Sequence, residues 1–142
     1  MYNPRAHLCF SAPKGQKSNN VAGTLPYEIS FLSKLTTFII PRGPVSGPFP
    51  DWSKLSTLEL LLLNNNQITG SFPTYILEKN PSLQAIQFEN NNFQGEFLQD
   101  LSSIDAVALT DLSVNGNDFT GTVSAQIYKL SSLGTFLDCC TR

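Results

Sequence analysis

Apolar residues recur at fixed distances before four equivalent positions of the chain, which are 43, 66, 91 and 117. Apolar side chains lie 3, 5, 8 and 11 positions before each of them, and Asn80 is the one exception. The residues at 3 and 5 positions back are two apart, so in an extended strand they project from the same face. The pattern therefore predicts stacked strands of a parallel sheet, whose inward-facing pairs are Phe38/Ile40, Leu61/Leu63, Ile86/Phe88 and Leu112/Val114.

A second motif recurs in step with these strands and reads asparagine, any, apolar, any, glycine, any, apolar, proline. Its glycines are Gly23, Gly47, Gly70, Gly95 and Gly121. Glycine can adopt backbone angles that are closed to other residues, and proline stiffens an extended stretch. After the prolines, Tyr27–Leu35 and Thr74–Lys79 have room for a short helix or 3₁₀ turn, whereas Asp51–Leu55 has room for a single turn.

The asparagine of the motif follows the strand, where the chain turns inward. Its amide group both donates and accepts hydrogen bonds, so it can satisfy loop backbone groups that have no water partner. Stacked copies would form a ladder of buried amides, which Gly43 would interrupt. The alternative is a set of exposed turn asparagines, which the constant register disfavours. The predicted ladder residues are Asn19, Asn66, Asn91 and Asn117.

The combined repeat resembles the plant-type leucine-rich repeat, LxxLxxLxLxxNxLxGxIPxx, of plant receptor-kinase ectodomains, polygalacturonase inhibitors and related "L domain-like" proteins. The resemblance extends from Asn19 to Leu137. It implies an α/β solenoid, a right-handed coil of about four to five repeats with a parallel sheet on its concave face. The departures are Gly43 in place of asparagine, Leu98 and Ser124 in place of proline, and Asn80 in place of leucine.

The two ends of the chain do not follow the repeat. Residues 1–18 lack the apolar positions of a strand and are expected to be irregular. Residues 19–138 are expected to form the repeat domain and residues 139–142 a tail. Near the end of the repeat domain, a fifth strand would begin with Leu130, Leu133 and Phe136.

The three cysteines are Cys9 and the neighbouring Cys139 and Cys140. Adjacent cysteines seldom bridge each other, because a disulfide between them strains the intervening peptide. The three cysteines form no self-contained disulfide framework. The sequence does not determine their redox state or the oligomeric state of the chain. The resembled family carries cysteine-paired caps at both ends in its extracellular members. We therefore expect the chain to be a truncated product of a longer gene.

Composition narrows the function classes. Of the 142 residues, 41% are hydrophobic and 14% charged, which suits one domain with a buried core. The net charge of -2 and the lack of a Lys/Arg cluster argue against nucleic acid as a partner. No apolar run is long enough to cross a bilayer, and the first residues lack a secretory signal. The composition is compatible with a cytosolic protein, whereas the family resemblance implies an extracellular or cell-surface location.

The sequence offers little catalytic chemistry. His7 is the one histidine, and neither a zinc-type cysteine pair nor a phosphate-binding glycine loop occurs. Glu59, Glu89 and Asp111 could share the concave face, where carboxylates more often face water or a partner than catalyse. We expect a non-catalytic protein without cofactor or metal.

The outward positions of the predicted sheet are the candidate binding surface, because repeat proteins commonly bind on their concave face. Ile39, Leu60 and Leu62 would form an apolar spot there, which either marks a contact site or is covered by a neighbouring segment. The expected function is binding of another protein or a peptide, as in a receptor-like protein. An inhibitor of the polygalacturonase-inhibitor type is the alternative, and an ice-binding or structural solenoid ranks last. The candidate partner-binding residues are Thr37, Ile39, Arg42, Leu60, Leu62, Asn64, Gln87, Glu89, Asp111, Ser113 and Asn115.

Overall fold

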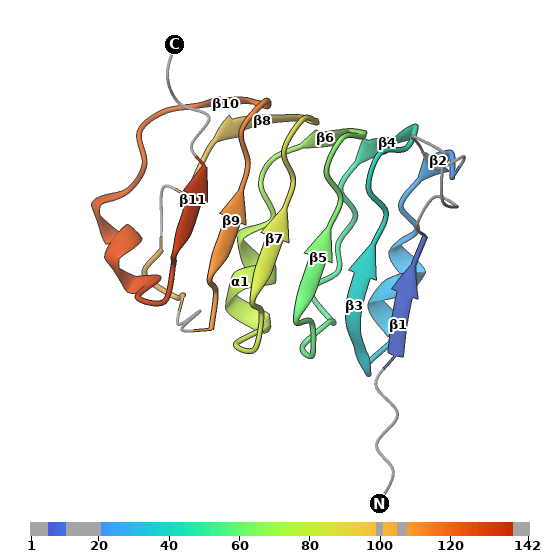
Figure 1. Cartoon of the computed structure of the whole chain (residues 1–142), viewed down its shortest axis with the longest axis horizontal. Coiled ribbons are helices and arrows are strands. Elements are labelled where there is room, and N and C mark those ends of the chain that lie inside the picture. Colours follow the sequence, from blue (N-terminus) through green and yellow to red (C-terminus); the bar gives the residue numbers. More distant parts are fainter. Residues whose placement is uncertain (1–5, 11–20, 99–100, 105–107, 138–142) are drawn as a thin grey trace, which may run out of the picture.

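A six-stranded parallel sheet forms one wall of a coiled chain (Figure 1). The structure, a computed structural model, describes residues 6–10, 21–98, 101–104 and 108–137. Each strand of the sheet pairs with the strand one coil further along, as the repeat predicts. In spatial order they are β1 (Ala6–Cys9), β3 (Leu35–Ile39), β5 (Leu60–Leu62), β7 (Ala85–Gln87), β9 (Asp111–Ser113) and β11 (Thr135–Leu137).

A second parallel sheet, which the sequence pattern did not predict, forms where the glycines of the motif recur. Each of these short segments lies beside its counterpart in the next coil, so the stacking that builds the first sheet also builds this one. The glycines within it have positive φ angles, such as +80° at Gly47, that bend the chain around the coil. Its strands are β2 (Gly23–Thr24), β4 (Val45–Pro48), β6 (Gln67–Gly70), β8 (Asn92–Glu96) and β10 (Asp118–Thr120).

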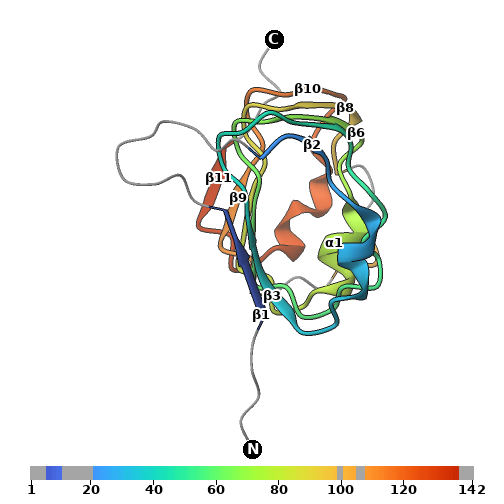
Figure 2. The same cartoon turned by 90° about the vertical axis from the view of Figure 1, so that its right-hand side faces the viewer.

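Short helices lie on the wall opposite the larger sheet, as the view along the coil shows (Figure 2). The 3₁₀ helix η1 (Tyr27–Phe31) and the helix α1 (Thr74–Lys79) confirm the two segments predicted to hold one. Residues 51–55 contain only a turn, also as predicted. A further 3₁₀ helix, η2 (Ala125–Lys129), begins after Ser124, whose hydroxyl accepts a hydrogen bond from the Gln126 N–H.

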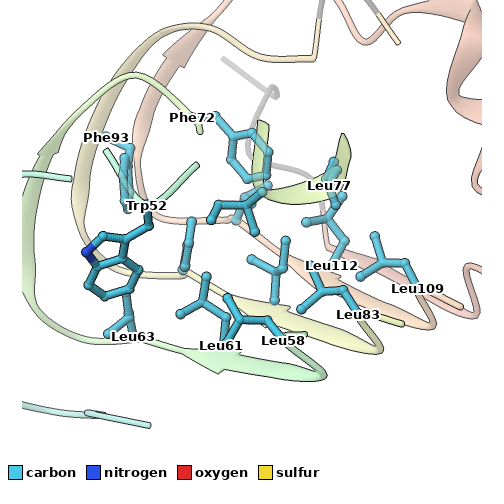
Figure 3. Close-up of a cluster of buried hydrophobic side chains, with 14 of the residues drawn as sticks. Trp52, Leu58, Leu61, Leu63, Phe72, Leu77, Leu83, Phe93, Leu109 and Leu112 are labelled. Atoms are coloured by element: carbon cyan, nitrogen blue, oxygen red, sulfur yellow. The ribbon is translucent and has the colours of Figure 1, made fainter. Parts of the chain in front are cut away.

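The predicted inward pairs line the interior of the coil, and all eight side chains are at most 3% exposed. Figure 3 shows how leucines of successive coils meet at the base of this core. Aromatic rings fill the space toward the second sheet. Phe93 stacks between Phe88 and Phe119, with ring centroids 5.0 and 6.0 Å apart. Trp52 is fully buried, and its indole N–H donates to the Pro26 carbonyl at 3.0 Å, so its one polar atom is satisfied.

The asparagine ladder is confirmed at the three positions that the structure describes. Asn91 accepts from the Ile68 N–H at 3.0 Å and donates to the carbonyl oxygens of Leu63 and Phe88 at 2.9 and 3.0 Å. Each rung therefore joins its own coil to the preceding one. Asn66 and Asn117 bond in the same way, and Gly43 has no side chain to do so. Asn19 lies outside the described residues.

The polar residue at an apolar position, Asn80, is also a connector. Its side chain is completely buried. The amide oxygen accepts from the Leu58 N–H at 2.9 Å, and the amide nitrogen donates to the Ile76 carbonyl at 3.0 Å. A leucine here would fill the same space, whereas asparagine adds a second buried link between coils.

The expectation that residues 1–18 are irregular is wrong for Ala6–Cys9, which form strand β1 and pair with β3. Leu8 aligns with Phe38, the inward position of the next coil. Counting back fixed distances from the asparagine of the motif did not locate β1. More residues separate β1 from the motif that follows it than separate each later strand from the motif that follows that strand. His7 and Cys9 are thus exposed strand residues and not part of a tail.

At the other end, β11 pairs with β9 and confirms the fifth predicted strand. No helix among the described residues is both long and apolar enough to cross a membrane.

The ladder provides a direct stability test in Asn91→Ala. Alanine leaves the Ile68 N–H without its acceptor, and the carbonyl oxygens of Leu63, Phe88 and Glu89 each lose a donor. We expect unfolding free energy to fall by about 2–3 kcal/mol, measured by urea denaturation. The matched control is Asn92→Ala, one residue further along and exposed, which should change stability little. Equal losses in both variants would contradict a structural role for the ladder.

Candidate functional site: the concave face of the larger sheet

Strand register arranges the outward side chains of the larger sheet in rows that cross the strands. One row contains Thr37, Leu60, Ala85 and Asp111, and the next contains Ile39, Leu62, Gln87 and Ser113. A third row follows the strands, where Asn64, Glu89 and Asn115 occupy equivalent positions. The structure thus brings ten of the eleven predicted surface residues together on one face, and Arg42 lies exposed at its edge.

Two residues of this face are less accessible than the sequence predicted. Thr37 is 7% exposed and Ser113 is 5% exposed, although both have outward register. Side chains on neighbouring strands are only about 5 Å apart, so larger neighbours cover small ones. Most of the remaining surface residues are partly exposed.

Ile39, Leu60 and Leu62 form the apolar patch predicted from the sequence. Ile39 aligns with Leu62, and Leu60 lies two residues before it on the same strand. All three are partly exposed, and none belongs to the hydrophobic core cluster or packs against it. The described part of the chain therefore covers the patch only in part.

A polar cluster lies beside the patch, on β7, β9 and the residues that follow them. Both oxygens of the Asp111 carboxylate are held, one by the Gln87 amide at 2.8 Å and the other by the Ser113 hydroxyl at 2.9 Å. Two further acceptor atoms, Glu89 Oε2 and Asn115 Oδ1, are buried without a hydrogen-bond partner. Buried acceptors normally have a partner, so a donor from outside the chain would satisfy these two atoms if their side chains turned outward to meet it.

The pKa of Glu89 is raised above its usual value. Burial of the carboxyl is the largest cause, and the negative charge of Asp111 adds to it. Hydrogen bonds from the Glu89 backbone and from the Asn64 side chain act in the opposite direction. The surface therefore holds a carboxylate whose ionised form costs free energy until a positive group approaches.

The edge of the face has a repeated backbone feature that the sequence reasoning missed. The residue before each ladder position has a positive φ angle, +57° at Arg42, +58° at Asn65, +55° at Asn90 and +70° at Gly116. Asparagine and glycine tolerate this conformation best, so their recurrence there was the available signal. The turn fixes the side chains at this edge, and the Asn90 amide donates to Asn65 Oδ1 at 3.1 Å.

Comparison with known proteins identifies the repeat. The Leucine Rich Repeat family matches residues 57–78. Pollen receptor-like kinase 2 of Arabidopsis thaliana is 33% identical over 92 residues, which are 65% of this chain and 14% of that protein. Receptor-like protein 39 of the same plant is 30% identical over 117 residues, or 82% of this chain and 13% of that protein. The chain thus spans about one seventh of the length of these relatives.

Solved receptor structures have the same fold. The plant peptide hormone receptor RGFR1 in complex with RGF2 superposes with a TM-score of 0.75 at 28% identity, covering 82% of this chain and 18% of that one. The PEPR1–AtPEP1 structure gives a TM-score of 0.74 at 33% identity, covering 82% and 16% respectively.

The stacked coils, the buried asparagine ladder and the concave parallel sheet define a solenoid repeat protein. The chain is built of leucine-rich repeats of the plant type, and it resembles the ectodomains of plant receptor kinases and receptor-like proteins.

Glu89→Gln tests the cost of the buried carboxylate. Because the pKa of Glu89 in the folded chain lies above its usual 4.5, the folded chain binds more protons than the unfolded one between these values. Wild-type stability therefore falls as pH rises through that interval. We expect Glu89→Gln to have a higher urea midpoint than wild type at pH 7, and we expect this advantage to disappear at pH 4.

The control for this comparison is Glu28→Gln, which removes an exposed carboxylate from η1 and should change stability little at either pH. A Glu89→Gln advantage that is the same at pH 7 and pH 4 would mean that the charge at Glu89 is not its cause.

Proposed function

We propose that this chain is a protein-recognition module that binds a peptide, or an extended segment of another protein, on the concave face. Its role is binding without catalysis. The observation that carries the proposal is the apolar patch of Ile39, Leu60 and Leu62, which is partly exposed and packs against no core residue. Partly exposed apolar side chains rimmed by polar groups are typical of contact surfaces.

The relatives support the same reading. Two of the similar structures contain receptors with bound partners, RGFR1 with RGF2 and PEPR1 with AtPEP1. A third, the BIR3–SERK2 complex from Arabidopsis thaliana, has a TM-score of 0.68 at 28% identity and pairs two proteins. By analogy, the partner of this chain is a peptide or a second receptor protein at the cell surface. The relatives described above are receptors and receptor-like proteins, so they offer no specific support for the inhibitor alternative.

Leu62→Asp tests this function. A charge at the centre of the patch would have to be desolvated on contact, so we expect affinity to fall at least about 10-fold. The measurement is isothermal titration calorimetry with a peptide selected on the unaltered chain from a random display library. Circular dichroism establishes that the variant is folded.

Leu32→Asp is the matched control, because it makes the same change at a leucine that is 42% exposed and lies just after η1, away from the larger sheet. Its affinity should equal that of wild type. A folded Leu62→Asp chain with unchanged affinity would place binding elsewhere on the molecule.

A further inference from the structure

The concave face has a one-sided charge distribution over its central strands. Residues 59–65, 84–90 and 110–116 include β5, β7 and β9 with their flanking turns. These segments contain Glu59, Glu89 and Asp111 but no lysine, arginine or histidine. None of these three segments therefore supplies a basic side chain that could neutralise Glu89 and Asp111.

The buried hydrogen-bond acceptors of this face that have no donor lie in two adjacent coils, at Glu89 and Asn115. Asp111 is already oriented by the Gln87 and Ser113 side chains, which leaves its remaining lone pairs directed away from them. Glu89 Oε2 and Asn115 Oδ1 lie in equivalent positions of adjacent coils, and neither has a donor. A guanidinium or ammonium group carries several N–H donors and positive charge, so it would satisfy both atoms once the Glu89 and Asn115 side chains turn toward it, and it would favour ionised Glu89.

The apolar patch and these acceptors are separated by a short, fixed distance. Leu62 lies on β5, whereas Glu89 follows β7 and Asp111 lies on β9, one and two strands further along. Parallel strands are about 4.8 Å apart, and Glu89 and Asp111 are each offset from the row of Leu62 by two residues along the strand, about 6.6 Å, so they lie roughly 8 Å and 12 Å from Leu62. An extended peptide advances about 3.3 Å per residue, so the interval from Leu62 to Glu89 corresponds to two or three residues.

We propose that the concave face recognises an extended peptide that crosses the strands, with an apolar side chain on Ile39, Leu60 and Leu62. A lysine or arginine two or three residues away from it contacts Glu89, Asp111 and Asn115. The inference rests on the proposed function and specifies the chemistry of its partner. The apolar contact supplies most of the buried area, whereas the basic contact fixes the orientation and register of the peptide.

The experiment is a parallel selection of random ten-residue displayed peptides on three forms of the full chain. They are the wild type, the Glu89→Gln/Asp111→Asn variant and Leu62→Asp. For the wild type we expect enrichment of an apolar residue with lysine or arginine two or three positions away. The double variant should retain the apolar preference and lose the basic one, and Leu62→Asp should enrich no common motif.

A second measurement uses the best arginine-containing peptide and its citrulline analogue, which has nearly the same shape but no charge. By fluorescence polarisation, the citrulline peptide should bind wild type about 10-fold more weakly and bind the double variant as well as the arginine peptide does. The control Glu28→Gln/Asp118→Asn removes two exposed carboxylates away from the face and should preserve the arginine preference.

The possible results separate the two proposals. Peptides that bind through Leu62 with no basic preference, or with one that survives in the double variant, overturn this inference and leave the recognition function standing. A failure to enrich any peptide above the Leu62→Asp background overturns both.

Discussion

Buried backbone groups in the turns of this chain need hydrogen-bond partners, and the asparagine ladder supplies them. After each strand the backbone enters the interior, where no water is available to its N–H and C=O groups. Asn66, Asn91 and Asn117 each satisfy such groups in two successive coils. The ladder keeps successive coils in the same register, and both sheets and the aromatic packing follow from that register.

The same constraint separates the inward positions, which repeat from coil to coil, from the outward positions, which differ from coil to coil. Inward positions such as Leu61 and Ile86 are fully buried, because each coil can complete its apolar interior only against its neighbours. Outward side chains do not have to pack between coils, so their residue types can be those that a partner requires. In this chain they place three partly exposed apolar side chains beside a group of hydrogen-bond acceptors. A rigid sheet holds both groups at a set spacing, which reduces the entropy lost on binding.

Glu89 is a residue that lowers the stability of the free chain and that we expect to strengthen the binding of a partner. Burial and the nearby Asp111 raise its pKa, so the ionised side chain weakens the fold when no partner is present. The Oε2 atom without a donor adds to that cost. Residues that disfavour the folded chain in this way are expected where a partner supplies the missing interaction, and less so on surfaces without a role.

The sequence by itself determined the coil, because a buried strand pair and a buried asparagine must recur at fixed spacing, and this spacing is visible without coordinates. It predicted the inward pairs, the ladder, two of the short helices and the face on which the candidate residues lie. The sequence pattern did not reveal strand β1, because the number of residues between Ala6–Cys9 and the next motif differs from the spacing in the later coils. Only the tertiary structure decided which outward atoms are covered or left without a donor, as at Ser113 and Asn115, since that depends on side chains brought together from different coils.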